Sequence, residues 1–223
     1  MRIPILKFLK SFIQDVPIET VHSDLNQTLE LILKNGQYQL CTENAVYSYG
    51  KHYTNFSDSF KRINLSQVHE VLVLGLGLCS IPIILESYKK QKFNFTGIEW
   101  DETVIYLASK YIIPQISSYL DVVQADATQF VHYTEEKFDL ICIDIFVDDK
   151  IPPEALSMEF LQGAADCLSE NGILISNHLG VLDSDKSHAQ AYYDSIFKSI
   201  FPDSTILHIK NNYMLLSDAS KIL

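Results

Sequence analysis

The chain has few cysteines and no long apolar run, and each shortage excludes a class of protein. No CxxC pair occurs among its four cysteines, which are Cys41, Cys79, Cys142 and Cys167. We therefore expect neither a metal site nor a disulfide framework, and free thiols fit a reducing, cytoplasmic location. No apolar stretch reaches the length that spans a bilayer, so we expect no membrane span.

Basic residues are also scarce: 17 Lys and Arg stand against 28 Asp and Glu, and the formal net charge is −11. This balance disfavours a nucleic-acid partner, because phosphate binding needs a basic surface. It mildly favours a cationic substrate, although an acidic surface also serves solubility alone. With 47% hydrophobic and 20% charged residues in 223, the composition is that of a globular protein.

The N-terminal stretch MRIPILKFLKSFIQDV resembles a targeting signal, but Lys7 and Lys10 interrupt its apolar run and no small-residue cleavage site follows. Its apolar residues fall on one helical face; they are Ile5, Leu6, Leu9, Phe12, Ile13 and Val16. This spacing predicts a helix that packs on the body or forms a dimer. A homodimer therefore stays open, as does contact of this helix with a membrane surface.

Residues 20–50 are rich in strand formers. TLELILK and QYQLCT flank Asn35-Gly36, which predicts a β-hairpin, and NAVYSYG is compatible with a further strand. We expect a small N-terminal domain of helix and hairpin over residues 1–52. The rest of the chain, residues 53–223, is then one larger domain.

From Val68 onward, apolar strand-like runs alternate with helix-like segments. The runs are HEVLVLG, FNFTGIEW, YLDVVQAD, FDLICIDIF and GILISN. Near-continuous Val, Ile and Leu strands separated by helices predict an α/β fold, a doubly wound parallel sheet. STILHIK and YMLLSD around Asn211-Asn212 predict a closing antiparallel hairpin. A parallel sheet that ends in this way is typical of the Rossmann-like fold of class I methyltransferases.

The stretch VLVLGLGLCSIP predicts a strand, a glycine turn and a helix, which is a common nucleotide-binding arrangement. Gly75 and Gly77 occupy the first two positions of the dinucleotide pattern GxGxxG, but Ser80 occupies the third. This departure weakens the case for a dinucleotide. A structural turn without a ligand also accounts for a lone GxG.

Two further strand ends carry residues suited to a nucleoside. Glu99 ends the second strand, where a carboxylate can accept both ribose hydroxyls. The alternative is a solvent-facing Glu before a helix capped by Asp101. Asp126 and the amide of Ala127 follow the third strand, where they can contact the adenine edge. An N-cap role for Asp126 is compatible with that contact.

Asp144 ends the fourth strand of this series, at the edge where open α/β sheets bind ligands. A carboxylate after an apolar run is costly to bury without a partner, which favours a catalytic role. Tyr47, Tyr49 and Tyr53 are candidate aromatic walls of a cation pocket, although hairpin packing explains them equally well. His178 also ends a strand, but a lone histidine there is more often only hydrogen-bonded, so we do not count it as catalytic.

Residues from about 20 to 217 resemble the spermidine-synthase-like branch of the class I S-adenosylmethionine-dependent transferases. The resemblance lies in VLVLGLGLCSIP, GIEWDETVIYLASKYI, VVQADATQF and the stretch from FDLICIDIF to GILISN. It implies that Gly75 and Gly77 approach the methionine end of the cofactor. It also implies that Glu99 holds the ribose and that Asp126 with Ala127 holds the adenine.

The chain departs from this branch at two motifs. The family's GGGDGG carries an acidic residue where this chain has Leu78-Cys79-Ser80. The family's DSSDP supplies two Asp; Asp144 matches the first, and Asp148 or Asp149 replaces the second only if the loop shifts.

Three functions follow from this resemblance and these departures. We rank first a methyl transfer from S-adenosylmethionine to a small-molecule acceptor, with Asp144 orienting or deprotonating that acceptor. The alternative is aminopropyl transfer from decarboxylated S-adenosylmethionine to a diamine. In that case the substrate contacts include Asp148, Asp149, Tyr49 and Tyr53. A non-catalytic nucleoside-binding protein is the third hypothesis.

Overall fold

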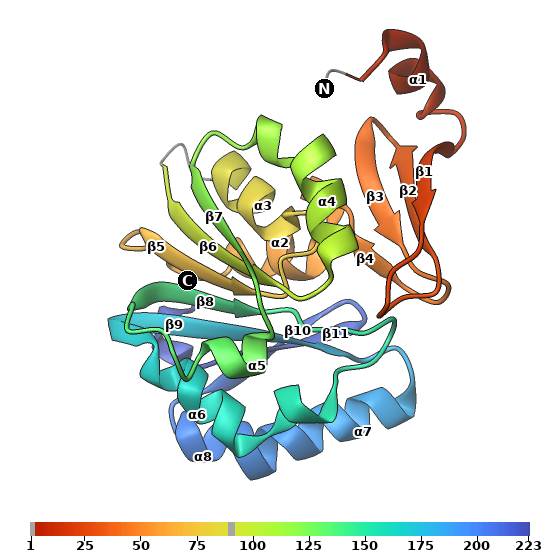
Figure 1. Cartoon of the computed structure of the whole chain (residues 1–223). Helices are drawn as coiled ribbons and strands as arrows, with labels where there is room; N and C mark the ends of the chain where they lie inside the picture. Colours follow the sequence, from red (N-terminus) through yellow and green to blue (C-terminus); the bar gives the residue numbers. More distant parts are fainter. Residues whose placement is uncertain (1–2, 89–91) are drawn as a thin grey trace.

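A computed structural model describes residues 3–88 and 92–223, which contain two β-sheets. The larger sheet has seven strands in the order β10-β11-β9-β8-β5-β6-β7 (Figure 1). Their bounds are β5 Glu70–Leu74, β6 Asn94–Glu99, β7 Tyr119–Gln124, β8 Phe138–Ile143, β9 Leu168–Leu179, β10 Thr205–Ile209 and β11 Asn212–Leu216. The first five are parallel, and β11 runs antiparallel to both β9 and β10. The predicted fold class is confirmed.

Helices cover both faces of this sheet (Figure 1). On one face lie α2 Thr54–Phe60, α3 Ser80–Tyr88 and α4 Glu102–Tyr111; on the other lie α5 Ala127–Phe130, α6 Met158–Asp166, α7 Asp183–Tyr192 and α8 Lys198–Ile200. Successive residues of β5 therefore enter different cores: Val71 packs in one cluster and Leu72 in the other. Burial on both faces explains why this strand is apolar throughout.

The smaller sheet is antiparallel, in the order β1-β2-β3-β4. Its strands are β1 Val16–Val21, β2 Leu29–Lys34, β3 Gln37–Cys41 and β4 Val46–Ser48. The predicted hairpin is present: Asn35 and Gly36 have φ of 50° and 74°, which suits a tight two-residue turn. Strand β1 was not predicted, because the apolar helical pattern was extended through Val16, which instead opens β1. The domain division after residue 52 stays a prediction.

The N-terminal helix α1, Ile5–Lys10, does not pack as predicted. None of its residues is buried, and Leu6 and Ile13 are 79% and 88% exposed. The segment reaches the hairpin turn through the rings of Phe8 and Phe12 and through Ser11, which accepts from the amides of Asn35 and Gly36. The expectation that the whole apolar face packs on the body is therefore wrong, and a dimer role is untested. Among the described residues, no helix is long and apolar enough to cross a membrane.

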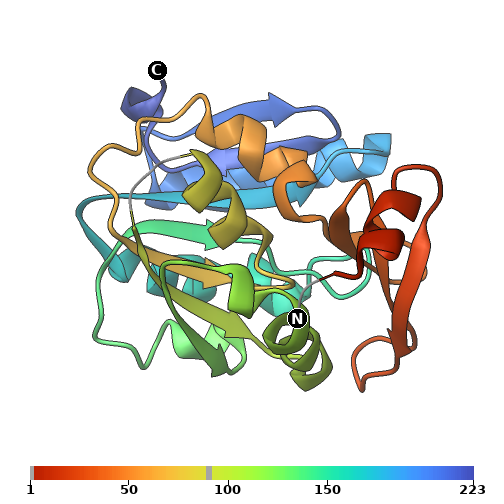
Figure 2. The same ribbon diagram turned by 90° about the horizontal axis from the view of Figure 1, so that it is seen from above.

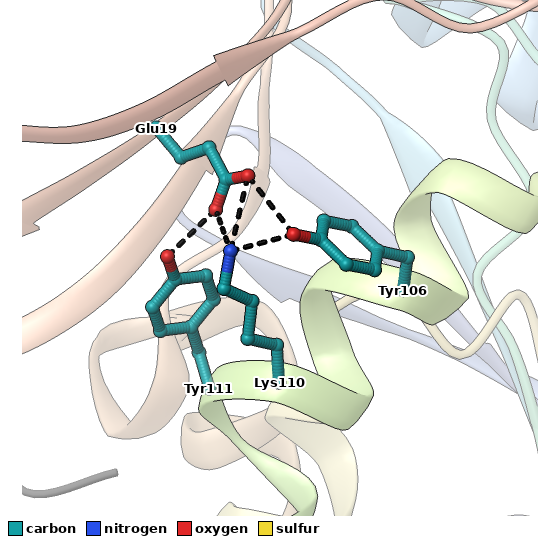
Figure 3. A network of polar contacts seen from close by, with 4 residues as sticks. All are labelled: Glu19, Tyr106, Lys110 and Tyr111. Atoms are coloured by element: carbon teal, nitrogen blue, oxygen red, sulfur yellow. Dashed lines mark hydrogen bonds and ion pairs between the residues drawn. The ribbon is translucent and has the colours of Figure 1, made fainter.

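The small sheet forms hydrogen bonds with both ends of helix α4. Figure 2 shows the small sheet beside the rest of the chain. At the helix C-terminus, the Glu19 carboxylate accepts from Lys110 Nζ at 2.9 Å and from the Tyr111 hydroxyl at 2.6 Å (Figure 3). Tyr111 is the main reason that the pKa of Glu19 is lowered. At the N-terminus, the next loop of the small sheet contacts Asp101, as described below.

Two smaller features concern the cysteines and the closing hairpin. All four cysteines are free, and Cys79, Cys142 and Cys167 are buried in the core. The closing hairpin turns through Lys210 and Asn211, one residue earlier than expected, because Ile209 pairs with Asn212.

Candidate active site

The glycine turn after β5 brings two strand ends into close contact. Gly75 has φ of 88°, and a Cβ there would lie 2.3 Å from the carbonyl oxygen of Asp144. Only glycine fits this approach without moving the backbone. Gly77 also has positive φ, 52°, and its amide faces Glu99. The turn therefore places its backbone directly beside the ends of β6 and β8.

The side chain of Leu78 does not enter the site. It is 1% exposed and belongs to the core, as does its neighbour Cys79. The position where relatives of the resembled branch carry an acidic residue thus contributes no charge here.

The Glu99 carboxylate is fixed by backbone amides rather than facing solvent. It accepts from the N–H groups of Gly77 at 2.9 Å, Trp100 at 3.0 Å and Asp101 at 3.1 Å. Burial raises the pKa of Glu99, and these bonds to the ionised form oppose the rise. Asp101 caps α4 by accepting from the amide of Thr103, as expected in the alternative considered for Glu99. The carboxylate is therefore preorganised at the place where a ribose would bind.

Asp126 takes the N-cap role considered for it, and its contact with adenine stays a prediction. Its Oδ1 accepts from the backbone N–H and the hydroxyl of Thr128, both at 2.8 Å, and so caps α5. No hydrogen bond between described residues reaches Oδ2, which is free for a ligand in the pocket. Ala127, which follows, is buried with its amide at the helix start.

Asp144 lies deep in the site and is held by two neighbours. Its Oδ1 accepts from Asn177 Nδ2 at 2.8 Å and from the Tyr53 hydroxyl at 3.2 Å. Asn177 is in turn oriented by Asn212, whose Nδ2 donates to Asn177 Oδ1 at 2.8 Å. Burial raises the pKa of Asp144 to about 6, against the two hydrogen bonds that lower it. This carboxylate can therefore exchange a proton near neutral pH.

Asp148 and Asp149 lie together in the turn after Asp144, in different surroundings. Asp148 accepts from the Thr42 hydroxyl and from Asn44, whose Nδ2 lies 2.6 Å away. These bonds, the one from Thr42 first, hold the pKa of Asp148 below its usual range. Asp149 is exposed at the pocket edge. A substrate contact from Asp149 stays a prediction, while the Asp148 carboxylate is already occupied by protein groups.

The two tyrosines predicted to contact substrate also line the site. Tyr53 reaches Asp144, and burial raises the pKa of its hydroxyl well above the usual value. The ring of Tyr49 lies 5.0 Å from that of His52, and its hydroxyl accepts from Asn35. Their roles toward substrate stay predictions, but neither is merely hairpin core.

All ten predicted site residues line one pocket of about 270 Å³; they are Gly75, Gly77, Glu99, Asp126, Ala127, Asp144, Asp148, Asp149, Tyr49 and Tyr53. Five acidic residues line it: Glu99, Asp126, Asp144, Asp148 and Asp149. No Lys or Arg in the described part of the chain does so. The pocket is thus strongly acidic, which favours a cationic ligand. No cluster suited to a metal ion was found among the described residues.

Several pocket residues had no role assigned from the sequence, among them Asn177, Trp100 and Ser80. Asn177 ends β9 beside Asp144, and the strand-end signal used for Asp144 also applied to it. The sequence showed only that Trp100 follows Glu99 and that Ser80 follows the glycine turn, which does not predict that either lines the pocket. Ser80 Oγ accepts from the amide of Tyr49 at 3.1 Å, a contact that no local pattern predicts.

His178 lies outside the pocket, beside the ring of Tyr192 at 4.9 Å. Burial lowers its pKa to about 4, so the ring is neutral at physiological pH.

A family model described as spermine/spermidine synthase domain matches residues 60–208. The chain belongs to the spermine/spermidine synthase family. The polyamine aminopropyltransferase of Vibrio vulnificus is 29% identical over 135 residues, which is 59% of this chain and 44% of that protein. The polyamine aminopropyltransferase of Alkaliphilus metalliredigens is 30% identical over 167 residues, or 70% of this chain and 58% of that protein. The chain therefore spans roughly half the length of these curated relatives.

Solved structures agree on the fold. A spermidine synthase in complex with the transition-state analogue AdoDATO has a TM-score of 0.69 and 18% identity, covering 90% of this chain and 72% of that one. Fibrillarin of Aeropyrum pernix, with bound S-adenosyl-L-methionine, has a TM-score of 0.57 and 11% identity, covering 90% and 98%. At these identities the likeness concerns the fold alone. The family match favours the aminopropyl alternative over the methyl transfer ranked first from the sequence.

Proposed function

We propose that this protein is a polyamine aminopropyltransferase, which moves an aminopropyl group from decarboxylated S-adenosylmethionine to a linear diamine. The observation that carries the proposal is the acidic pocket, with five carboxylates and no Lys or Arg among its described lining residues. Membership of the spermine/spermidine synthase family supports the same reaction class.

The charge of the pocket separates the two donors. S-adenosylmethionine carries a carboxylate beside its amine, and here that carboxylate would face Asp144 and Glu99 without a basic side chain to pair with it. The decarboxylated donor is a dication, with a sulfonium and an ammonium, and gains from every carboxylate in the wall. Because Leu78 removes the acidic residue of the glycine turn, this recognition rests on carboxylates from the other strand ends.

The donor nucleoside fits the residues at the ends of β5, β6 and β7. Gly75 and Gly77 both line the pocket, so the backbone of the glycine turn would lie against the donor near the sulfonium. Glu99, already held by three amides, would accept the ribose hydroxyls, and Asp126 Oδ2 would accept the adenine amine. The bound donor supplies the electrophile, a propyl carbon attached to a positively charged sulfur.

Asp144 would act on the acceptor amine. A new C–N bond forms as the C–S bond breaks, and the electron pair of that bond stays on sulfur, which leaves as a neutral thioether. The amine proton passes to Asp144, directly or through a water, since the pKa of about 6 lets this carboxylate accept it near neutral pH. Tyr53 and Asn177 keep the carboxylate aimed, and Asp149 with the Tyr49 ring would hold the distal ammonium.

The test is a donor and acceptor panel. The purified chain is incubated with either donor and a series of linear diamines, and products are separated by mass spectrometry. We expect an aminopropylated amine together with methylthioadenosine, only from the decarboxylated donor. Calorimetry should show that the decarboxylated donor binds at least tenfold more tightly than S-adenosylmethionine, a difference in binding free energy of about 1.4 kcal/mol.

Two results would contradict this proposal. Tighter binding of S-adenosylmethionine, with a methylated product, would restore the methyl-transfer hypothesis. Binding of a nucleoside without transfer to any diamine would favour the non-catalytic reading.

A further inference from the structure

One hydroxyl, that of Tyr47 in β4, lies where three segments of the chain meet. It accepts from the amide of Asp148 at 2.7 Å and lies 2.9 Å from the carbonyl oxygen of Phe146. On its other side it lies 3.2 Å from Oδ1 of Asn26, in the loop between β1 and β2. Burial raises the pKa of Tyr47, so the phenol stays protonated and can donate one bond while accepting another.

From Asn26 the contacts continue to the nucleoside side of the pocket. Asn26 is 6% exposed, and its Nδ2 donates to Asp101 Oδ2 at 3.2 Å. The same carboxylate oxygen accepts from Ser23, and the Asp101 amide donates to Glu99. The loop between β1 and β2 is thus held to the start of α4 beside Glu99, while the single Tyr47 proton has its nearer acceptor in the Phe146 carbonyl oxygen, at 2.9 Å against 3.2 Å for Asn26.

The turn that follows Asp144 needs support. Val147 and Lys150 pair through two backbone bonds of 2.8 and 3.1 Å around Asp148 and Asp149. Asp148 adopts φ of 54°, a left-handed conformation that costs energy for a residue with a side chain. Its amide has Tyr47 as partner, and its carboxylate has Thr42 and Asn44. Every one of these side chains comes from β4 or from the segment that precedes it.

We infer that Tyr47 is a positioning residue: its hydroxyl holds the 145–150 turn in the conformation that presents Asp149 to the acceptor. The small sheet is then part of the acceptor site through this hydroxyl, although Tyr47 itself does not contact the reacting atoms. The acceptor role rests on the proposed function, whereas the hold on the turn does not.

The first test needs no substrate. Tyr47→Phe removes one oxygen, and Tyr38→Phe in the neighbouring strand is the matched control, because Tyr38 is a buried residue whose hydroxyl makes no hydrogen bond to a described residue. Amide hydrogen exchange of residues 145–150 is measured in both variants. We expect at least about threefold faster exchange at Asp148 in Tyr47→Phe, and wild-type rates in Tyr38→Phe. Equal rates in the two variants would overturn the inference.

The second test asks whether the acceptor depends on the turn. In Tyr47→Phe the KM for the diamine should rise at least about threefold, while calorimetric affinity for the donor stays at the wild-type value. An unchanged diamine KM would overturn the acceptor role. If Tyr47→Phe fails to fold, Asn44→Ala loosens the same turn from an exposed position, with smaller changes of the same sign. A wild-type chain without transfer activity would refute the proposed function, and exchange alone would then decide the positioning role.

Discussion

The donor half and the acceptor half of the pocket are built in different ways. On the donor side, Gly77, Glu99 and Asp126 are held by contacts that are short in sequence or lie between adjacent parallel strands. On the acceptor side, Asp148 is bonded to Asn44 and Tyr47, about a hundred residues away along the chain. Under the proposed function, the donor would therefore be recognised at strand ends of the larger sheet, while the acceptor site would depend on the position of the small sheet.

The largest expected effect is the loss of activity on substitution of Asp144, which lies between the two halves of the pocket. Asp144→Asn keeps an oxygen for Asn177 and Tyr53 but removes the base, so we expect kcat to fall about 10² to 10⁴-fold. Donor affinity, measured by calorimetry, should change little. Loss of donor binding in this variant would mean that the two halves are not separable.

The stability of Asp144→Asn provides a second readout with a definite sign. The folded-state pKa is raised from 3.8 to about 6, so the folded protein is stabilised below pH 3.8 and loses that stability as pH rises through 6. Removing the charge should therefore raise the free energy of unfolding at pH 8 by up to about 3 kcal/mol. The free energy of unfolding of both proteins is measured by denaturant titration at pH 8 and at the lowest pH at which both stay folded. An equal gain in stability of Asp144→Asn at the two pH values would contradict the prediction.

Next in size is the glycine turn of the donor half. Gly75→Ala places a Cβ against the Asp144 backbone, at positive φ, and should cost at least about 2 kcal/mol of folding stability and most donor affinity. Gly77→Ala is the matched variant, since its nearest neighbour is 3.7 Å away and only the φ of 52° opposes it, at about 1 kcal/mol. Thermal unfolding should rank them in that order; equal losses would rule out the close approach as the cause.

The pH dependence of transfer is expected to be smaller but more specific. Above a pKa of about 6, Asp144 is ionised and can accept the amine proton; below it, kcat/KM should fall about tenfold per pH unit. A profile without an inflection near 6 would remove Asp144 as the base. His178→Gln is the control, because the pKa of His178, near 4, keeps it neutral over the same range.

The smallest effect should come from the attachment of the small sheet to α4. Glu19→Gln removes the ion pair between Glu19 and Lys110, whose side chains are 22% and 33% exposed, respectively. Because the pair is partly exposed, we expect the free energy of unfolding to fall by about 1 kcal/mol or less. Tm should fall by about 4 °C at most, with kcat unchanged. A fall in kcat without a change in Tm would mean that the far end of α4 also shapes the site.

The same contrast explains what was predictable from the sequence. Gly75, Glu99 and Asp126 each lie at the carboxyl end of a strand in the alternating strand-helix pattern. Because those ends meet at one edge of a parallel sheet, the pattern predicted that the three residues line one pocket. The Asp148 contacts could not be predicted, because they depend on how two sheets are docked. Strand β1 was missed for a different reason: the apolar helical pattern was extended through Val16, although VPIETV is rich in β-branched residues and pairs with β2.

Trp100 gives the pocket an optical property of its own. It is the sole tryptophan of the chain, 54% exposed, and it forms part of the pocket wall next to the Glu99 carboxylate. A purine arriving beside Asp126 would exclude water from the indole and stack near it, which changes the intensity and wavelength of its emission. If the proposed nucleoside site is correct, the emission of the unlabelled protein would report its occupation, free of background from any second indole.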